Sequence, residues 1–237
     1  MKIENSVALV TGASRGIGRE LVNALVAGGA KRVYAGARNP KGIDTRGGRV
    51  VPLELDITNA RHVERAALDA RDVNLLVNNA GVLSAFSLLS TSRETVESEF
   101  ATNFYGPLAM IRAMLPSLER APESAIANVL TVVSLASMPA LGGYSATKAA
   151  AWSLTQALRA ELKARKIAVH AVFPGPVDTD MARDITLPKT PPADVARAIV
   201  RSIAAGEEDI LPDPMARQVF EQWRRDPKAV EHQFAAM

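Results

Sequence analysis

Short runs of β-branched and aliphatic residues alternate with longer amphipathic stretches along almost the whole chain, and this alternation limits the possible folds more than any other feature. Because the short runs are apolar on both faces, they are typical of parallel strands that helices cover on both sides. The pattern predicts an α/β fold with a doubly wound parallel β-sheet, in one domain that spans residues 1–237. The expected strands are 7–11, 32–36, 50–55, 74–80, 125–133, 168–173 and 209–211, and the expected helices are 17–29, 60–70, 93–120, 144–165 and 193–205.

Glycines and prolines mark the places where the expected helices end or bend. Gly28 and Gly29 follow the first expected helix and are typical of a carboxyl-terminal cap. In the long helix expected over 93–120, we expect Pro107 to cause a kink and Pro116 to lie near the end. The reason is that proline has no N–H for the helical hydrogen bond.

The last quarter of the chain is expected to lie on the substrate side. The segment Met181–Pro192 is polar and rich in proline, which predicts a loop after the sixth strand. From Pro212 on, aromatic residues stand among charged ones, and we expect one or two short helices docked on the body of the protein or on a partner subunit. Residues from about 181 to 237 are therefore expected to form a small extension that shapes the substrate side.

Composition argues against several classes of protein. The absence of cysteine excludes disulfides and thiolate chemistry. The formal charge of +3 comes from scattered Lys and Arg and gives little support to nucleic-acid binding. His62, His170 and His232 are dispersed, so no metal site is predicted. No apolar run approaches the roughly 18–20 residues that a membrane span needs, and we expect a soluble cytoplasmic protein.

A glycine-rich loop follows the first expected strand and opens the first expected helix. Glycine suits a backbone that turns sharply and approaches a pyrophosphate closely, and the free N–H groups of a helix start favour an anion. An ordinary glycine-rich turn between strand and helix is the alternative. The candidate cofactor contacts in this loop are Gly12, Ser14, Arg15, Gly16, Ile17 and Gly18.

The end of the second expected strand bears on the choice of dinucleotide. An acidic residue there would hold the adenosine ribose hydroxyls of NAD, but the chain has Ala37 followed by Arg38. A guanidinium at Arg38, with Arg15 as a second positive charge, suits a 2′-phosphate. The pair favours NADP(H) over NAD(H), although two exposed loop arginines are also common.

The third and fourth expected strands end in further candidate cofactor contacts. Asn79 could bridge neighbouring strands or support the cofactor, while Ala80 and Gly81 leave room for a ring to pack closely. Asp56, followed by Ile57, could accept a hydrogen bond from the adenine amino group. Asp56 could equally be a helix cap.

Tyr144 and Lys148 are four residues apart on an expected helix, so their side chains lie on one face. An ammonium beside a phenol favours the phenolate and lowers the tyrosine pKa from about 10. Such a tyrosine can exchange a proton near neutral pH.

Taken together, these motifs resemble those of the short-chain dehydrogenase/reductase family, with its TGxxxGxG and YxxxK patterns. The resemblance rests on Thr11–Gly18, Asn78–Gly81, Asn103, Tyr144 with Lys148, and Pro174–Thr179, and it covers roughly residues 5–181. It implies a single-domain Rossmann fold that binds NAD(P).

The resemblance also implies a role for each matching residue. Tyr144 would be the proton donor to a carbonyl or the base on an alcohol, and Lys148 would lower the tyrosine pKa and hold the nicotinamide ribose. Asn103 would hold a water molecule that links Lys148 to solvent. The turn residues Pro174, Gly175 and Val177 and the hydroxyl of Thr179 would seat the nicotinamide ring and its carboxamide.

One position departs from the family's pattern. The family usually has serine thirteen residues before the tyrosine, and this chain has Thr131 there. Threonine offers the same hydroxyl but adds a methyl group that is stiff at χ1. We favour Thr131 for this role, with Ser134 as the alternative.

The leading hypothesis is an NADP(H)-dependent carbonyl reductase or alcohol dehydrogenase that acts on an apolar ketone, aldehyde or secondary alcohol. Substrate choice is expected to depend on Ser84–Leu89, Ser137–Leu141 and Met181–Pro192. A nucleotide-binding sensor or scaffold with little turnover is the alternative. A dehalogenase-type lyase is disfavoured, because such relatives lack the lysine and the glycine loop. The resemblance also implies a homodimer or homotetramer.

Overall fold

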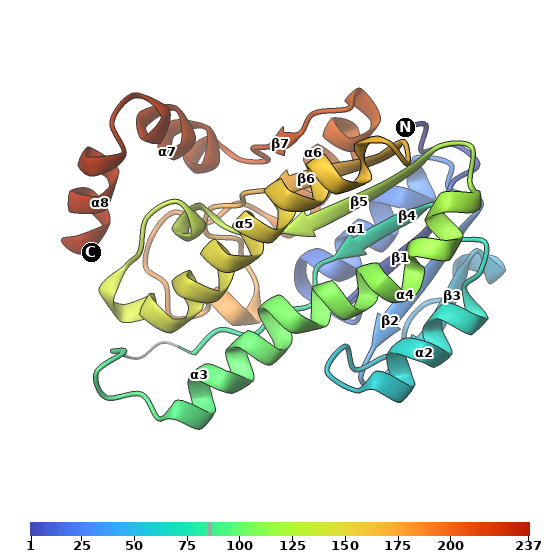
Figure 1. The fold of residues 1–237 in the computed structure, drawn as a ribbon, viewed down its shortest axis with the longest axis horizontal. Helices are drawn as coiled ribbons and strands as arrows, with labels where there is room; N and C mark the ends of the chain where they lie inside the picture. The colour runs from blue at the N-terminus through green and yellow to red at the C-terminus, as the bar shows by residue number, and fades with distance from the viewer. Residues whose placement is uncertain (85–86) are drawn as a thin grey trace.

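A computed structural model describes residues 1–84 and 87–237, and it shows a seven-stranded sheet in which each pair of neighbouring strands is parallel (Figure 1). The strand order is β3-β2-β1-β4-β5-β6-β7. The strands are β1 Val7–Thr11, β2 Arg32–Ala37, β3 Val50–Glu54, β4 Leu75–Asn78, β5 Ser124–Val129, β6 Ile167–Val172 and β7 Asp209–Ile210. The strands are added outward from β1 in both directions, with β2 and β3 on one side and β4 to β7 on the other. The loops after β1 and β4 therefore diverge and leave a crevice at the carboxyl edge of the sheet.

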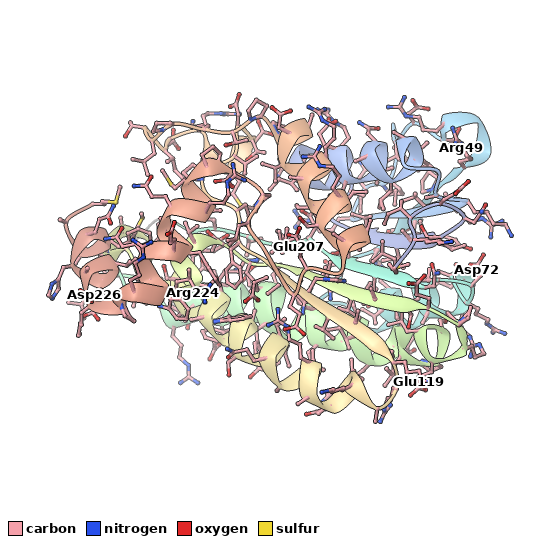
Figure 2. All side chains as sticks on the ribbon, turned by 90° about the horizontal axis from the view of Figure 1, so that it is seen from above. Arg49, Asp72, Glu119, Glu207, Arg224 and Asp226 are labelled. Carbon is pink, nitrogen blue, oxygen red and sulfur yellow. The ribbon has the colours of Figure 1, made fainter. Side chains whose placement is uncertain are left out.

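Helices cover both faces of the sheet, as the apolar character of the strands on both sides predicts (Figure 2). One face packs on α1 Gly16–Ala27 and α6 Pro192–Ala205, and the other packs on α2 Ala60–Asp69, α4 Gly106–Arg120 and α5 Gly142–Lys163. Leu21 and Ile199 are fully buried in the first layer, and Met110 and Leu158 are buried in the second. The prediction of a doubly wound α/β fold is confirmed.

The long helix expected over 93–120 is three segments. Helix α3, Arg93–Phe100, leads into a π-helical turn, Ala101–Tyr105, and α4 begins at Gly106. The N–H of Gly106 bonds to the carbonyl of Ala101, five residues back. The expected kink at Pro107 is therefore misplaced. The chain widens one turn earlier, and Pro107 lies in the first turn of α4, where its missing N–H is tolerated.

Two helices close the carboxyl-terminal end, α7 Pro214–Arg225 and α8 Pro227–Ala235. Their apolar residues Val219, Val230 and Phe234 form a buried cluster with Val132 and Tyr144. Both helices thus dock on the body of the protein beside the carboxyl edge of the sheet, as Figure 1 shows for α7. In the part of the chain that the structure describes, no helix has the length and apolar character of a membrane span.

Candidate active site

A cavity of about 740 Å³ opens at the carboxyl edge of the sheet. Loops that follow β1, β2, β3, β4, β5 and β6 line it, together with the start of α5. Among the candidate catalytic and cofactor-binding residues named from the sequence, only Asn103 and the alternative Ser134 lie outside its lining, and the described residues of the predicted substrate segment 84–89 lie outside it as well. Those that line it are Gly12, Ser14, Arg15, Gly16, Ile17, Gly18, Arg38, Asp56, Ile57, Asn79, Ala80, Gly81, Thr131, Tyr144, Lys148, Pro174, Gly175, Val177 and Thr179.

The glycine loop is shaped by contacts that no larger residue could make. Gly12 and Gly16 have positive φ angles of 68° and 53°. A Cβ on Gly18 would lie 2.1 Å from the Gly12 carbonyl oxygen, so the first turn of α1 presses against the loop. No side chain caps α1 at Arg15. The backbone N–H groups of this turn are therefore available to an anion in the cavity, and the cradle fits a dinucleotide pyrophosphate.

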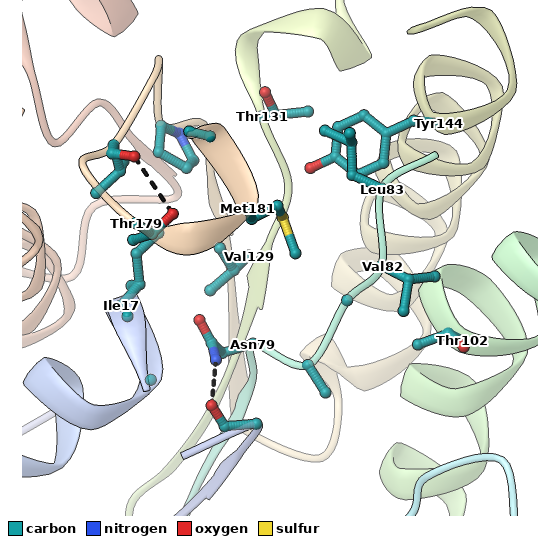
Figure 3. A pocket seen from close by; sticks show the side chains of 18 of the residues that line it. Ile17, Asn79, Val82, Leu83, Thr102, Val129, Thr131, Tyr144, Thr179 and Met181 are labelled. Atoms are coloured by element: carbon teal, nitrogen blue, oxygen red, sulfur yellow. Dashed lines mark hydrogen bonds between the residues drawn. The ribbon is translucent and has the colours of Figure 1, made fainter. Parts of the chain in front are cut away.

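Asn79 ties the ends of β1 and β4 together. Its Nδ2 donates to the carbonyl oxygens of Thr11 and Gly12, at 2.9 and 3.3 Å. In return, the Thr11 Oγ1 accepts from the backbone N–H groups of Asn79 and Ala80, both at 3.0 Å. The expected strand-bridging role of Asn79 is therefore present, and Figure 3 shows the side chain at the floor of the cavity.

Arg38 and Asp56 lie at the end of the cavity reached by β2 and β3. The Asp56 carboxylate accepts from the N–H and hydroxyl of Thr58, at 2.9 and 2.7 Å. These bonds lower the pKa of Asp56, and the nearby Arg38 charge adds a smaller effect of the same sign. The cap of α2 is Asn59, so the helix-cap alternative for Asp56 is wrong. Arg15, in contrast, forms an exposed ion pair of 3.5 Å with Asp180.

Tyr144 and Lys148 lie one turn apart on α5, and both are buried. The Lys148 Nζ lies 5.8 Å from the Tyr144 ring centre and donates to the Val129 carbonyl at 2.8 Å. Burial lowers the pKa of Lys148 to about 8. Burial also raises the pKa of Tyr144 well above its usual range, and the negative charge of Glu99 adds to this. The effect of the protein alone is thus opposite to the expected lowering, because removal from water outweighs the ammonium.

Asn103 lies in the π-helical turn and joins three segments. Its Oδ1 accepts from the Val82 N–H at 2.9 Å, and its Nδ2 donates to the Val82 carbonyl at 2.9 Å and to the Thr147 hydroxyl at 3.0 Å. The Thr147 hydroxyl donates to the Tyr144 carbonyl at 2.7 Å. Asn103 is therefore more than a polar residue of a helix interior, since its side chain connects the loop after β4 with α5.

A small cavity of about 10 Å³ lies behind the main one, lined by Asn103, Lys148 and Asn78 among others. It has the volume of roughly one water molecule. The buried Oδ1 of Asn78 has no hydrogen-bond partner. Proline at position 107 also has no N–H to donate to the Asn103 carbonyl. The unsatisfied Asn78 oxygen beside a cavity of this size fits an internal water next to Lys148.

The hydroxyls of Thr131 and Ser134 both accept hydrogen bonds from backbone N–H groups of the short turn that contains them. The Thr131 Oγ1 accepts from the Val133 N–H at 3.4 Å, and the Ser134 Oγ accepts from the Thr131 N–H at 3.3 Å. Ser134 is buried. Figure 3 shows the Tyr144 hydroxyl pointing into the cavity and the Thr131 hydroxyl directed away from it. Only Thr131 lines the cavity, and its hydroxyl needs a χ1 rotation to face Tyr144.

Sequence reasoning missed Glu99 and Met215. Glu99 is buried, and its Oε1 accepts a hydrogen bond from the Ser84 N–H at 2.7 Å. Ser84 begins the predicted substrate segment 84–89, of which residues 85 and 86 lie outside the described residues. Glu99 lies four residues before Asn103, and this spacing could have predicted from the sequence that both side chains lie on one helix face. Met215 lines the cavity from the start of α7, and no local pattern marks it. Within residues 1–84 and 87–237, no cluster of His, Cys, Asp or Glu could hold a metal ion.

Comparison with known proteins identifies the family. The family model described as "short chain dehydrogenase" matches residues 6–189. The chain belongs to the short-chain dehydrogenase family. It is therefore an oxidoreductase of a family that binds a nicotinamide dinucleotide.

Three relatives show how similar the known members are. A short-chain dehydrogenase from Burkholderia cenocepacia J2315, solved in complex with NADP, is 38% identical with a TM-score of 0.94, over 99% of each chain. "Carbonyl reductase [NADPH] 2" of Sus scrofa is 35% identical over 182 residues, which cover 76% of this chain and 75% of the relative. A member from Burkholderia phymatum, solved with NAD, is 24% identical with a TM-score of 0.85, over 97% of this chain and 96% of the other, and shows the fold alone.

The buried amine of Lys148 generates a prediction about stability. Its folded-state pKa of about 8 lies below the ordinary value of 10.5, so between these pH values the unfolded chain binds more protons than the folded one. The free energy of unfolding of the wild type therefore rises with pH across this window. The rise, relative to that of a Lys148→Met variant, is on the order of 3 kcal/mol.

Urea unfolding of both proteins at about pH 7.5, 9 and 10 measures this difference. Lys163→Met is the matched control, because Lys163 is exposed at the end of the same helix. A difference between wild type and Lys148→Met that stays constant with pH contradicts the buried, readily deprotonated amine.

Proposed function

We propose that this short-chain dehydrogenase is an NADP(H)-dependent carbonyl reductase or alcohol dehydrogenase, in which Tyr144 exchanges the proton. The observation that carries the proposal is the convergence of the glycine cradle, Arg38 and the Tyr144–Lys148 pair on one cavity. The bound nicotinamide supplies or accepts the hydride. The side chains of the protein hold the two reactants and move a proton.

The preference for NADP(H) rests on charge at the adenosine end. Ala37 offers no carboxylate to ribose hydroxyls, and Arg38 follows it at the cavity edge. A guanidinium there pairs with a 2′-phosphate, which NAD lacks. The relatives solved with NADP and named for NADPH point in the same direction. Arg15 contributes less, because its ion pair with Asp180 already engages it.

The proton chemistry depends on burial of Tyr144 and Lys148. At neutral pH a phenol with a raised pKa is protonated, so in reduction Tyr144 is ready to donate to a carbonyl oxygen. The ammonium of Lys148 then stabilises the phenolate that this donation leaves, and its lowered pKa lets it pass on a proton. The small cavity beside Asn103 gives that proton a path through one water molecule.

The substrate end of the cavity is apolar. Its walls include Leu83, Leu141, Ile185 and Leu187, with methionines at positions 138, 181 and 215. Methionine adapts its shape and makes no strong hydrogen bonds. We therefore infer an apolar ketone, aldehyde or secondary alcohol as substrate. The extension over residues 181–237 supplies several of these walls. The cytoplasmic location and the homodimer or homotetramer stay predictions.

The orientation of Thr131 favours a second candidate, a dinucleotide-binding sensor or scaffold with little turnover. Its hydroxyl is directed away from Tyr144 (Figure 3), so the second donor to a carbonyl oxygen is not in place without a rotation. NADPH oxidation against a panel of apolar ketones and aldehydes separates the two candidates. Binding of NADPH without consumption across the panel would establish the sensor.

Tyr144→Phe tests the proton donor. Loss of the phenol hydroxyl is expected to lower kcat by about 10²- to 10⁴-fold, while NADPH affinity stays unchanged. Tyr105→Phe is the control, because Tyr105 is exposed and outside the cavity lining. Steady-state NADPH oxidation and a binding titration measure the two effects. Undiminished turnover in Tyr144→Phe overturns the proposed mechanism.

Arg38→Ala tests the choice of dinucleotide. Removal of the guanidinium is expected to weaken NADPH binding by about tenfold and leave NADH binding unchanged, because only NADPH carries the 2′-phosphate. Arg49→Ala, outside the cavity lining and labelled in Figure 2, is the control for a general change in charge. Equal affinities of wild type for NADPH and NADH count against the preference.

Substitutions at positions 131 and 134 decide which hydroxyl acts. Thr131→Val keeps the shape and removes the hydroxyl, and we expect kcat to fall by about tenfold or more. Thr131→Ser removes the stiff methyl group, and we expect kcat at least as high as in the wild type. Ser134→Ala should leave kcat unchanged. A loss of turnover in Ser134→Ala but not in Thr131→Val would reassign the role to Ser134.

A further inference from the structure

The register of the last two strands brings Gly175 and Asp213 together. In the parallel pair of β6 and β7, Val172 lies opposite Ile210. Gly175 follows the first of these residues by three positions, and Asp213 follows the second by three. Neighbouring parallel strands end at the same edge, so the turn after β6 meets the segment that opens α7.

The Asp213 carboxylate joins these two segments through both of its oxygens. Its Oδ2 accepts from the Gly175 N–H at 2.9 Å, and its Oδ1 accepts from the Ala216 N–H at 2.8 Å as the amino-terminal cap of α7. Asp213 is only 1% exposed. Pro174 and Pro176 have no N–H, so the Gly175 N–H is the one backbone donor in that part of the turn, and Asp213 engages it.

Close packing fixes the position of the turn as well. A Cβ on Gly175 would lie 2.9 Å from the Asp213 Oδ1 and 3.1 Å from the Met215 Cβ. Gly175 and Met215 both line the cavity. Any movement of Asp213 would therefore shift the turn and the methionine that face the cavity.

We infer that Asp213 is a positioning residue for the nicotinamide half of the cofactor. It holds the turn Pro174–Val177 and Met215 in the arrangement that seats the ring, and so connects the carboxyl-terminal helices to the reacting end of the cavity. The inference rests on the proposed function. The adenosine half is held elsewhere, by the glycine loop after β1 and by Arg38 after β2. The loss of Asp213 therefore affects one half of the cofactor and spares the other.

Asp213→Ser tests this, because serine has one oxygen and cannot accept at both places. We expect NADPH affinity to fall by about tenfold, with the affinity for adenosine 2′,5′-bisphosphate unchanged. Asp226→Ser is the matched control. Asp226 is also followed by proline and caps α8 by accepting from the Ala229 N–H, at the outer carboxyl-terminal end labelled in Figure 2. It should leave both affinities unchanged.

Gly175→Ala is a second variant, and it gives the answer where Asp213→Ser does not fold. The added methyl group forces the turn away from Asp213, and the same selective loss of NADPH affinity is expected. If the wild type prefers NADH, the same comparison is made with NADH and ADP.

Unchanged NADPH affinity in Asp213→Ser or in folded Gly175→Ala overturns the inference. An equal loss for NADPH and for adenosine 2′,5′-bisphosphate also overturns it, since that result shows a general structural role. Failure of the proposed function has a different signature: the wild type then binds the dinucleotide but consumes none of it across the panel of ketones and aldehydes, whatever the variants do to affinity.

Discussion

The contact between the glycine loop and the end of β4 is the constraint on which the site depends. Gly12, Gly18 and Asn79 approach so closely that a Cβ on Gly18 would strike both the Gly12 carbonyl oxygen and the Asn79 amide. The same amide, which follows β4, donates hydrogen bonds to the Thr11 and Gly12 carbonyls at the end of β1. These contacts bring the first turn of α1 to the point where the sheet changes winding direction, and the cavity opens there. Without this approach, the glycine loop and the Tyr144–Lys148 pair would not line one crevice.

Burial controls the chemistry at the other end of the cavity. An isolated tyrosine and lysine in water are both poorly suited to exchange a proton at neutral pH, since each has a pKa near 10. Removal from water keeps the phenol of Tyr144 protonated and makes the ammonium of Lys148 easier to deprotonate. The two shifts have one cause, and in the proposed mechanism they favour proton donation in the direction of carbonyl reduction. Glu99 strengthens the first shift, although it lies outside the cavity lining.

Much of this architecture could be predicted from the sequence, because strands and glycine loops leave local patterns. Apolar runs predicted all seven strands, and local patterns at strand ends predicted cavity-lining residues from Gly12 to Gly81, while the family resemblance added Pro174, Gly175, Val177 and Thr179. The π-helical turn at Ala101–Tyr105 could not be predicted, since it depends on how Asn103 bonds to the loop after β4. The direction of the Tyr144 pKa shift was also missed, because burial is a property of the packed molecule and not of the spacing between two residues.

Asp213 lies in a segment beyond the family match and contacts a turn inside it. The family match ends at residue 189, so the turn at Pro174–Val177 lies inside it and Asp213 and Met215 lie outside. Parallel pairing of β6 with β7 forces the two segments to meet, whatever residues follow β7. A carboxylate at this meeting point uses one oxygen for the turn and the other for its own helix. In the proposed arrangement, the end of the chain forms part of the substrate wall and also holds the turn Pro174–Val177 in register, because both tasks depend on where α7 begins.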